Sequence, residues 1–304
     1  MNYVLFLGGR IGLEALLVIT SHVKVGYVFV EKEHAHEHAH YSSQITEVCD
    51  QKKIGHDRDL SPDRVLAMCH QLKPDYLMCF GYRRMIPADV IATARIGCIG
   101  SHFAPLPRYR GFAPLNWVLI NGEPSTAVNV FFLVDEVDAG DILAQKKIEI
   151  TEQDDINTLT EKCVAAMPGV LKDALVQLES GNPVGEPQDH TLATYTCSRN
   201  PDDGLIDWSQ SSKAICNLVR ALTYPWPGAY TYYKGKKLYV WKCEEHEELP
   251  YEGRICGKII KIRDGALKVL TGDGSIWITQ CSSDPDDPIV NDFAFNSIRV
   301  TLGV

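Results

Sequence analysis

Two side chains that can take part in proton transfer, His102 and Asp138, each follow an apolar run that is typical of a strand. His102 ends the run IGCIGSH, and Asp138 lies in the turn VDEVDAGDI behind a strand expected over 127–134. In open α/β sheets, ligands bind beyond the carboxyl ends of the strands. If these two strands end side by side, the imidazole can exchange a proton while the carboxylate orients it. The alternatives are a hydrogen-bonded structural histidine and a solvated acidic hairpin.

The elements that must position these side chains alternate between strands and helices. A strand over 3–7, the pair Gly8-Gly9, a helix over 11–19 and a strand over 25–30 form a βαβ unit. Further strands are expected over 75–80, 96–101, 127–134 and 141–150, and helices over 61–72, 87–94, from about 113, and over 156–181. Pro168 should kink the last helix or cap a segment of it. The pattern predicts the α/β class, with an N-terminal Rossmann-like open twisted sheet.

A second, smaller domain is expected after a change of composition. Proline and glycine accumulate over 182–204, which is typical of a linker. A helix over 211–223 and five short alternating stretches with glycine turns follow, and they favour an OB-like β-barrel. The predicted domains are therefore a catalytic domain over 1–190, a linker over 191–210 and a barrel over 211–304.

Composition narrows the class of protein. The chain has 304 residues, 45% of them apolar, and a formal net charge of −9, which disfavours a large nucleic-acid footprint. Its apolar runs are far shorter than the roughly 20 residues that span a bilayer, so no membrane partner is expected. The N-terminal MNYVLFLGG is typical of a first strand rather than of a signal peptide. The ten cysteines show no CxxC spacing, which favours buried, reduced thiols and a cytoplasmic location.

Two other patterns are weaker evidence for a functional site. HAHEHAH at 34–40 has a histidine at every second position, and imidazoles so close together can bind zinc or nickel. A polar loop after the second strand is the favoured interpretation, so no metal is expected at the functional site. The pair Gly8-Gly9 is not a dinucleotide fingerprint, because GxGxxG is absent.

Several stretches resemble the N10-formyltetrahydrofolate-dependent formyltransferases. HFAPLPRYRGFAPLNWVLINGE at 102–123 is similar to the signature of that family, and VDEVDAGDILAQ at 134–145 to its folate loop. FGYRRMIP at 80–87 resembles the segment that holds the pteridine, and 199–230 resembles the start of the C-terminal barrel. The likeness is closest to sugar N-formyltransferases, such as the formyltransferase domain of the UDP-aminoarabinose-modifying enzyme. Methionyl-tRNA formyltransferase shares the same plan.

The resemblance implies formation of an amide on an amine. The amine attacks the formyl carbon of N10-formyltetrahydrofolate, the formyl donor, while a histidine, an asparagine and an aspartate stabilise the oxyanion and move protons. His102 and Asp138 match the histidine and the aspartate. The donor contacts that the resemblance implies are Arg84, Met85, Ile86, Asp135 and Val137.

The sequence departs from the family pattern at Gly100, where the family has its asparagine. Ser101 or a backbone N–H can take over the hydrogen bond, or a nearby amide can supply it. Asn129, on the strand that leads to Asp138, is the candidate amide. The alternatives are that Asn129 is merely hydrogen-bonded within its strand, and that the chain is a weakly active or non-catalytic folate-binding relative.

The expected acceptor is a nucleotide-linked amino sugar, with methionyl-tRNA as the alternative. A tRNA needs a basic surface for its phosphates, and the chain is acidic. The expected substrate contacts are Gly9, Arg10, Arg108, Tyr109 and Arg110, because the arginine fork binds phosphate in a bidentate manner. For Arg110, a structural role in its loop is the alternative. The sugar, the nucleotide and the oligomeric state, including a homodimer, stay open.

Overall fold

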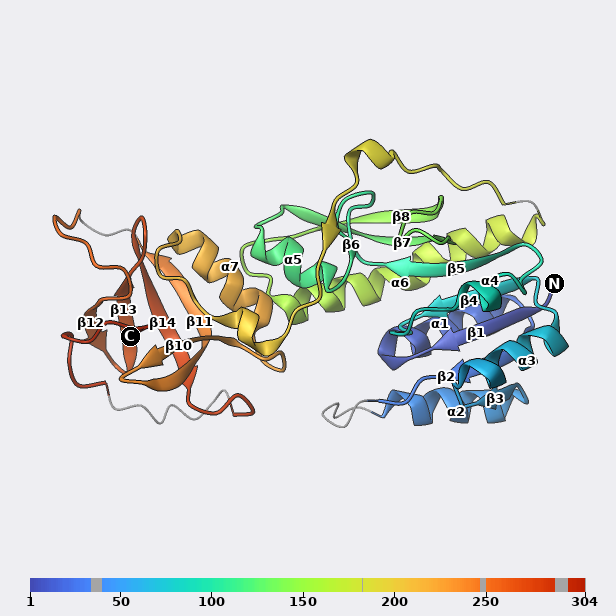
Figure 1. Ribbon diagram of the computed structural model, residues 1–304, viewed down its shortest axis with the longest axis horizontal. Coiled ribbons are helices and arrows are strands. Elements are labelled where there is room, and N and C mark those ends of the chain that lie inside the picture. Colours follow the sequence, from blue (N-terminus) through green and yellow to red (C-terminus); the bar gives the residue numbers. More distant parts are fainter. Residues whose placement is uncertain (34–39, 182, 247–249, 288–294, 304) are drawn as a thin grey trace. The chain divides into compact units, whose positions relative to one another are not determined.

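The computed structural model describes residues 1–304 except 34–39, 182, 247–249, 288–294 and 304. The chain forms two compact units (Figure 1). The first comprises residues 1–111, 126–148 and 161–195, and the second comprises 112–125, 149–160 and 196–304. Each unit is described by itself below.

A seven-stranded sheet organises the first unit, with the strand order β3-β2-β1-β4-β5-β7-β8. The strands are β1 Tyr3–Leu7, β2 Val25–Val30, β3 Gly55–Asp57, β4 Tyr76–Phe80, β5 Gly97–His102, β7 Ser125–Leu133 and β8 Ile142–Glu149. The first five strands in the chain pair in parallel. β7 runs antiparallel to β5, with Asn129 opposite His102 and Leu133 opposite Cys98.

Helices cover both faces of the parallel part of this sheet. They are α1 Gly9–His22, α2 Tyr41–Lys52, α3 Pro62–Leu72 and α4 Ala88–Ile91. Val4 and Phe6 of β1 pack in one cluster with Val65 of α3. Leu7, which points to the other face, lies against Gly12 of α1. Every residue of β1 is buried, as expected for a parallel strand between two helical layers.

Two glycine turns meet at the carboxyl ends of β1 and β4. The N–H of Gly8 donates to the carbonyl of Phe80 at 3.1 Å. A Cβ atom on Gly81 would lie 2.1 Å from the Gly8 carbonyl oxygen, and its φ is +63°. Only glycine fits such a contact in the left-handed region. The buried carboxylate of Glu31, at the end of β2, accepts the N–H of Arg83 at 3.0 Å in the same region.

A five-stranded antiparallel sheet organises the second unit, in the order β10-β11-β14-β13-β12. The strands are β10 Ala229–Tyr233, β11 Lys236–His246, β12 Ile259–Arg263, β13 Ala266–Leu270 and β14 Ser275–Ser282. Helix α7, Ser212–Leu222, packs against β11 and against α5, Pro114–Ile120. Trp241 of β11 is buried, and its indole N–H donates to the hydroxyl of Ser282 at 2.8 Å.

The predicted fold class is confirmed, and all five strands expected after residue 223 are present. α2 and β3 were not expected. The sequence of α2 is mostly polar and buries only Ser42, Ile45 and Cys49, so its apolar periodicity is weak. Helix α6, Ile156–Glu179, runs without interruption through Pro168, so this proline does not cap a separate segment.

The predicted domain boundaries at 190 and 210 treat each domain as one continuous stretch, whereas residues 112–125 and 149–160 pack with the second unit. The region expected to be a linker contains ordered elements. They are the 3₁₀ turns His190–Leu192 and Pro201–Gly204 and the strand β9, Tyr195–Thr196, which pairs with β6, Arg110–Gly111.

Residues 34–39 of the His-rich stretch lie outside the described residues. In the part of the chain that the structure describes, no group of three or more His, Cys, Asp or Glu side chains is arranged to hold a metal ion. Across the same residues, no helix has the length and apolar character needed to cross a membrane.

The turn at Gly81 provides a stability test. Gly81→Ala should lower the free energy of unfolding by more than about 1–2 kcal/mol, the cost of a left-handed backbone for an L-residue, because the Gly8 carbonyl also blocks the new methyl group. Gly169→Ala is the matched control, since nothing lies within 4 Å of a Cβ at that position in α6. It should raise the stability by about 0.5–1 kcal/mol. Urea unfolding measures both, and equal effects of the two substitutions would contradict the role assigned to Gly81.

Candidate active site

His102 is the last residue of β5, and only 8% of it is exposed. Its Nε2 atom lies 2.8 Å from the carbonyl oxygen of Tyr109. A carbonyl can only accept, so the neutral ring carries its hydrogen on Nε2 and has a lone pair on Nδ1. The fold therefore selects the ring nitrogen that is able to take up a proton.

The carboxylate of Asp138 faces that nitrogen. Its Oδ2 atom lies 3.5 Å from His102 Nδ1 and accepts the N–H of Gly111 at 2.7 Å. A separation of 3.5 Å is long for a hydrogen bond. In the neutral ring, Nδ1 and the carboxylate are both acceptors, so the contact becomes attractive only when the ring is protonated. The pair suits proton uptake, with the charged ring stabilised by a carboxylate that the main chain holds in place.

Asp138 reaches His102 by a route that differs from the expected one. Because β7 is antiparallel to β5, its last residue, Leu133, lies opposite Cys98 near the start of β5 and not beside His102. The five residues that follow can span at most about 17 Å, and they turn back so that Asp138 meets the ring. Asp138 has a φ of +51°, which aspartate tolerates. The expectation that the two strands end side by side was wrong, since the turn delivers the carboxylate.

Asn129 has no solvent exposure, and the contacts of its amide are all to the protein. Its Nδ2 atom donates to the carbonyls of His102 at 2.8 Å and Ala104 at 2.7 Å. Its Oδ1 atom accepts the side-chain N–H of Gln145 at 2.6 Å. Both amide hydrogens are thus used to hold the end of β5, which favours the structural role of Asn129 over the predicted oxyanion role.

An apolar side chain fills the space beside Gly100. A Cβ atom there would lie 2.8 Å from Cδ2 of Leu133, so this side chain occupies the space that a larger residue at position 100 would enter. Ser101 cannot replace the family's asparagine, because successive residues of a strand point to opposite faces. Gly100 and His102 share one face of β5, and Ser101 lies on the other.

Arg110 is fully buried and its guanidinium group is engaged by other side chains. It donates to Gln188 Oε1 at 2.8 Å and to Glu136 Oε1 at 3.2 Å. The Tyr195 hydroxyl lies 3.3 Å from Arg110 and also donates to Glu136, where it lowers the pKa of that carboxyl, with a smaller contribution from Arg110. These contacts support the structural alternative for Arg110 rather than binding of a phosphate.

Arg108 and Tyr109, which precede Arg110 in the PRYRG loop, differ in their exposure. Arg108 is exposed, with its guanidinium carbon 5.2 Å from the centre of the Tyr109 ring. Tyr109 is buried and has a φ of +61°, which is uncommon for a bulky residue. Arg108 is therefore the more exposed of the two arginines in this loop.

A pocket of about 580 Å³ lies next to the Asp138 turn. It is lined by Ile91, Ala94, Ile96, Gly97, Cys98, Phe132, Leu133, Val134, Glu136, Ala139, Gly140, Asp141 and His190. This size falls within the range of about 300–1,000 Å³ that is usual for small-molecule sites. Gly140 is required at its edge, because a Cβ there would lie 1.9 Å from the Phe132 carbonyl oxygen.

The predicted donor contacts do not line this pocket directly. Ile86 packs against the core cluster of the first unit, and Met85 is 76% exposed. Arg84 lies with its Nε atom 3.5 Å from Oε1 of Glu31. Asp135 and Val137 are exposed in the same turn as Glu136, which does line it.

The predicted substrate contacts at the end of β1 form a separate group. Gly9 has a φ of +55° and a Cβ there would meet nothing within 4 Å. Arg10 forms an ion pair with Glu161 of α6. The structure does not bring either residue into contact with the His102–Asp138 pair.

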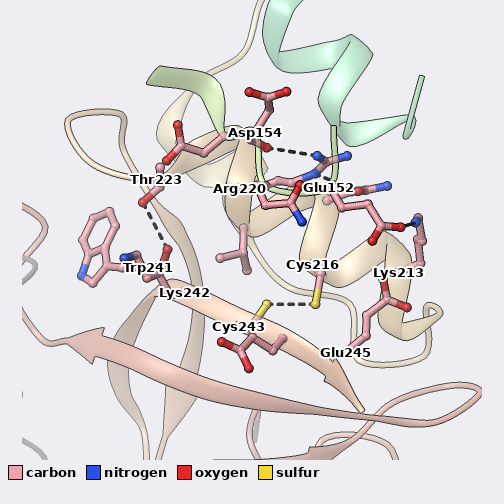
Figure 2. A pocket seen from close by; sticks show the side chains of 15 residues that line it. Glu152, Asp154, Lys213, Cys216, Arg220, Thr223, Trp241, Lys242, Cys243 and Glu245 are labelled. Carbon is pink, nitrogen blue, oxygen red and sulfur yellow. Dashed lines mark hydrogen bonds and ion pairs between the residues drawn. The ribbon is translucent and has the colours of Figure 1, made fainter. Parts of the chain in front are cut away.

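A second pocket, of about 410 Å³, lies within the second unit (Figure 2). Two of its cations are paired: Lys213 lies 3.2 Å from Glu152, and Arg220 donates to the Asp154 carbonyl at 3.0 Å. The thiols of Cys243 and Cys216 are 3.2 Å apart, and this contact, together with burial, raises the pKa of Cys243. This pocket lacks a histidine–carboxylate pair, so the proton-transfer site is assigned to His102.

Sequence reasoning missed the groups that hold the catalytic pair in place. The Tyr109 carbonyl, Gln188 and Thr194 contact the loops of His102 and Asp138. Gln188 and Thr194 lie in a region rich in proline and glycine, where no periodic pattern reveals which polar side chains point inward.

Solved structures share this fold at low identity. HypX from Aquifex aeolicus with tetrahydrofolic acid is 22% identical, with a TM-score of 0.62, over 91% of this chain and 43% of its own; the chain thus spans less than half of HypX. The N-formyltransferase from Helicobacter canadensis with folinic acid and dTDP-3-aminofucose is 17% identical, with a TM-score of 0.71, over 91% and 99%. Methionyl-tRNA formyltransferase from Clostridium thermocellum is 18% identical, with a TM-score of 0.56, over 81% and 94%.

Two family profiles match the sequence itself. The profile of the formyl transferase C-terminal domain matches residues 199–292. The formyl transferase profile matches residues 10–175, which include His102, Asp138 and most of the first unit. Since this match covers more than half of the chain, the protein belongs to the formyl transferase family.

Proposed function

We propose that this enzyme transfers the formyl group of N10-formyltetrahydrofolate to the amine of a nucleotide-linked amino sugar. The observation that carries formyl transfer is the contact of 3.5 Å between His102 Nδ1 and Asp138 Oδ2. A pocket lined by Glu136, Ala139 and Gly140 of the Asp138 turn, though not by His102, offers room for the donor. Family membership supplies the reaction class, and the geometry supplies the groups that move its proton.

The donor's pteridine ring would occupy the pocket of about 580 Å³. Apolar side chains such as Ile91 and Leu133 offer surfaces for a flat ring, while Glu136 and the main chain of the turn supply polar edges. Arg84, Met85 and Ile86 precede α4, which ends at the pocket with Ile91, and Asp135 and Val137 flank Glu136. We retain these five as donor contacts outside the innermost wall.

N10-formyltetrahydrofolate supplies the formyl carbon, and the amine nitrogen forms a bond to this carbon as the bond to N10 breaks. One proton passes overall from the amine to N10. His102 takes that proton on Nδ1, the nitrogen left free by the Tyr109 carbonyl, and returns it to the leaving nitrogen. Asp138 stabilises the charged imidazole between the two transfers.

Negative charge develops on the formyl oxygen during the attack and needs hydrogen-bond donors. Asn129 is committed to the carbonyls of His102 and Ala104, and Leu133 fills the space beside Gly100. The protonated ring of His102 and main-chain N–H groups are the remaining donors.

The acceptor is inferred from the net charge of this chain and from how much of a sugar N-formyltransferase the chain matches. A net charge of −9 opposes the close approach of a tRNA. The Helicobacter canadensis enzyme, whose structure holds dTDP-3-aminofucose, matches this chain over 99% of its own length. Arg108 is the exposed arginine of the loop next to His102, and Gly9, Arg10 and Tyr109 remain predicted substrate contacts.

The proposed acceptor is tested with the purified chain, N10-formyltetrahydrofolate and a panel of dTDP- and UDP-linked amino sugars. Formation of a product heavier by one carbonyl group, detected by mass spectrometry, is the expected result. Initiator methionyl-tRNA is assayed in parallel. Formylation of this tRNA alone would reject the sugar acceptor and leave formyl transfer standing, whereas absence of transfer to any amine would reject the enzymatic role.

His102→Asn should lower kcat by roughly 100-fold or more, the usual loss for a proton-transfer group or an oxyanion donor. The affinity for the donor should hardly change, because the ring acts only on the reacting atoms. Ser101→Ala is the control, since that side chain points to the other face of β5. Steady-state kinetics measure kcat and KM for both variants. Near-full turnover of the His102 variant would remove His102 from the mechanism.

Two substitutions separate the functions of Asp138. Asp138→Asn keeps an oxygen for the Gly111 N–H but removes the charge, so kcat should fall while the KM for the donor holds. Asp138→Ala also frees the turn that lines the pocket, so kcat should fall and the KM should rise. Kinetics and thermal melting are compared, and an effect on melting alone would show that the carboxylate is only structural.

Asn129→Ala should act mainly on stability. It removes the bonds from Asn129 to the buried carbonyls of His102 and Ala104 and to the amide of Gln145, at roughly 1–3 kcal/mol for each group left unsatisfied; the Ala104 carbonyl keeps the N–H of Leu106. Urea unfolding and kcat are measured together. A loss of kcat by 10²–10³-fold with unchanged stability, as expected for an oxyanion donor, would restore the catalytic role of Asn129.

A further inference from the structure

Residues 185–195, which we call the connecting segment, lie between the two family matches, which end at 175 and begin at 199. They pack with the first unit. The segment is anchored to the edge of β8 by a pair of main-chain hydrogen bonds of 2.8 Å between Glu186 and Ile142. From this edge it runs along both loops that carry the proton-transfer groups.

Gln188 fixes the turn of Asp138. Its side chain is 6% exposed, and its Nε2 atom donates to the carbonyls of Asp138 at 2.8 Å and Gly140 at 2.7 Å. These bonds use both amide hydrogens. They hold the main chain of a turn that leaves the sheet at Leu133 and must return to meet the ring of His102.

Thr194 fixes the loop on the other side of the ring. Its Oγ1 atom accepts the N–H of Tyr109 at 3.0 Å, and its carbonyl accepts the N–H of Arg110 at 2.9 Å. These bonds hold Tyr109 in its left-handed conformation, with a φ of +61°. The carbonyl of that residue then receives the Nε2 hydrogen of His102.

Arg110 links Gln188 to the loop that Thr194 holds. Its buried guanidinium donates to Oε1 of Gln188 at 2.8 Å and lies 3.3 Å from Nδ1 of His190. A displacement of Gln188 therefore also removes one partner of Arg110, which keeps its contacts with Glu136 and Tyr195. Gln188 and Thr194 therefore belong to one network of hydrogen bonds.

We infer that the connecting segment sets the geometry of the catalytic pair, with Gln188 positioning Asp138 and Thr194 positioning the Tyr109 carbonyl that selects the tautomer of His102. Neither residue contacts the reacting atoms, so both are positioning residues. This inference rests on the proposed function only in assigning the pair to formyl transfer. A misplacement of about 1 Å can cost roughly 100-fold in rate.

The test uses four variants of the full chain. Thr194→Val removes the hydroxyl, and Thr194→Ser is the conservative variant that keeps it. Gln188→Glu is nearly isosteric but directs a carboxylate oxygen at the carbonyls of Asp138 and Gly140. Thr191→Val is the matched control, because Thr191 lies in the same segment and its hydroxyl bonds only to Asp189 within that segment.

Thr194→Val should lower kcat by roughly 10–100-fold with an unchanged KM for N10-formyltetrahydrofolate, and Thr194→Ser should restore turnover. Gln188→Glu should lower kcat to a similar extent and raise that KM, because the Asp138 turn also forms the pocket wall. Thr191→Val should behave as the wild type. A wild-type kcat in both Thr194→Val and Gln188→Glu would overturn the inference, as would an equal loss in Thr191→Val.

A second readout does not need turnover. Nitrogen-15 NMR of histidine-labelled protein reports which ring nitrogen of His102 carries the hydrogen, and His102→Asn identifies its signals. Thr194→Val should reduce the population with the hydrogen on Nε2, and Thr194→Ser should restore it. If the wild type transfers no formyl group, the proposed function fails while this measurement still decides on the connecting segment, and unchanged ring signals in Thr194→Val would reject it.

Discussion

The hydrogen bond from His102 Nε2 to the Tyr109 carbonyl, at 2.8 Å, determines how the site is arranged. Because Nε2 donates its hydrogen to this acceptor, Nδ1 has to serve as the base. The groups around Nδ1 are therefore the groups that surround the proton taken up by the ring. The carboxylate of Asp138 lies on that side. A carbonyl is a strict acceptor, so this choice of tautomer does not depend on the protonation of any neighbouring group.

That His102 and Asp138 lie close together could be predicted from sequence, because each follows an apolar run, and their side chains are 3.5 Å apart. The geometry that joins them could not. Asp138 was expected beside His102 because the two neighbouring strands were expected to end side by side, yet β7 is antiparallel to β5. The direction of a strand depends on how the connection before it folds in space. The periodicity of the sequence between β5 and β7 does not show whether the chain enters β7 parallel or antiparallel to β5.

The residues for which the sequence left both a functional and a structural role open are polar side chains with several available partners. Asn129 and Arg110 have the chemistry to bind an oxyanion or a phosphate, but both are consumed by contacts inside the protein. Which partner a buried amide or guanidinium finds depends on segments distant in sequence, such as Gln188 for Arg110. The open α/β sheet and the five C-terminal strands could be predicted because they follow from local periodicity.

The return of the chain from Leu133 to Asp138 separates the catalytic carboxylate from the sheet. Residues within paired strands are fixed in register, and an inserted residue there would exchange the two faces. The turn lies outside this register, and its main chain is held by Gln188 and by the close approach of Gly140 to Phe132. A change in the number of residues between Leu133 and Asp138 would therefore alter the reach of the carboxylate without shifting the pairing of β5 with β7.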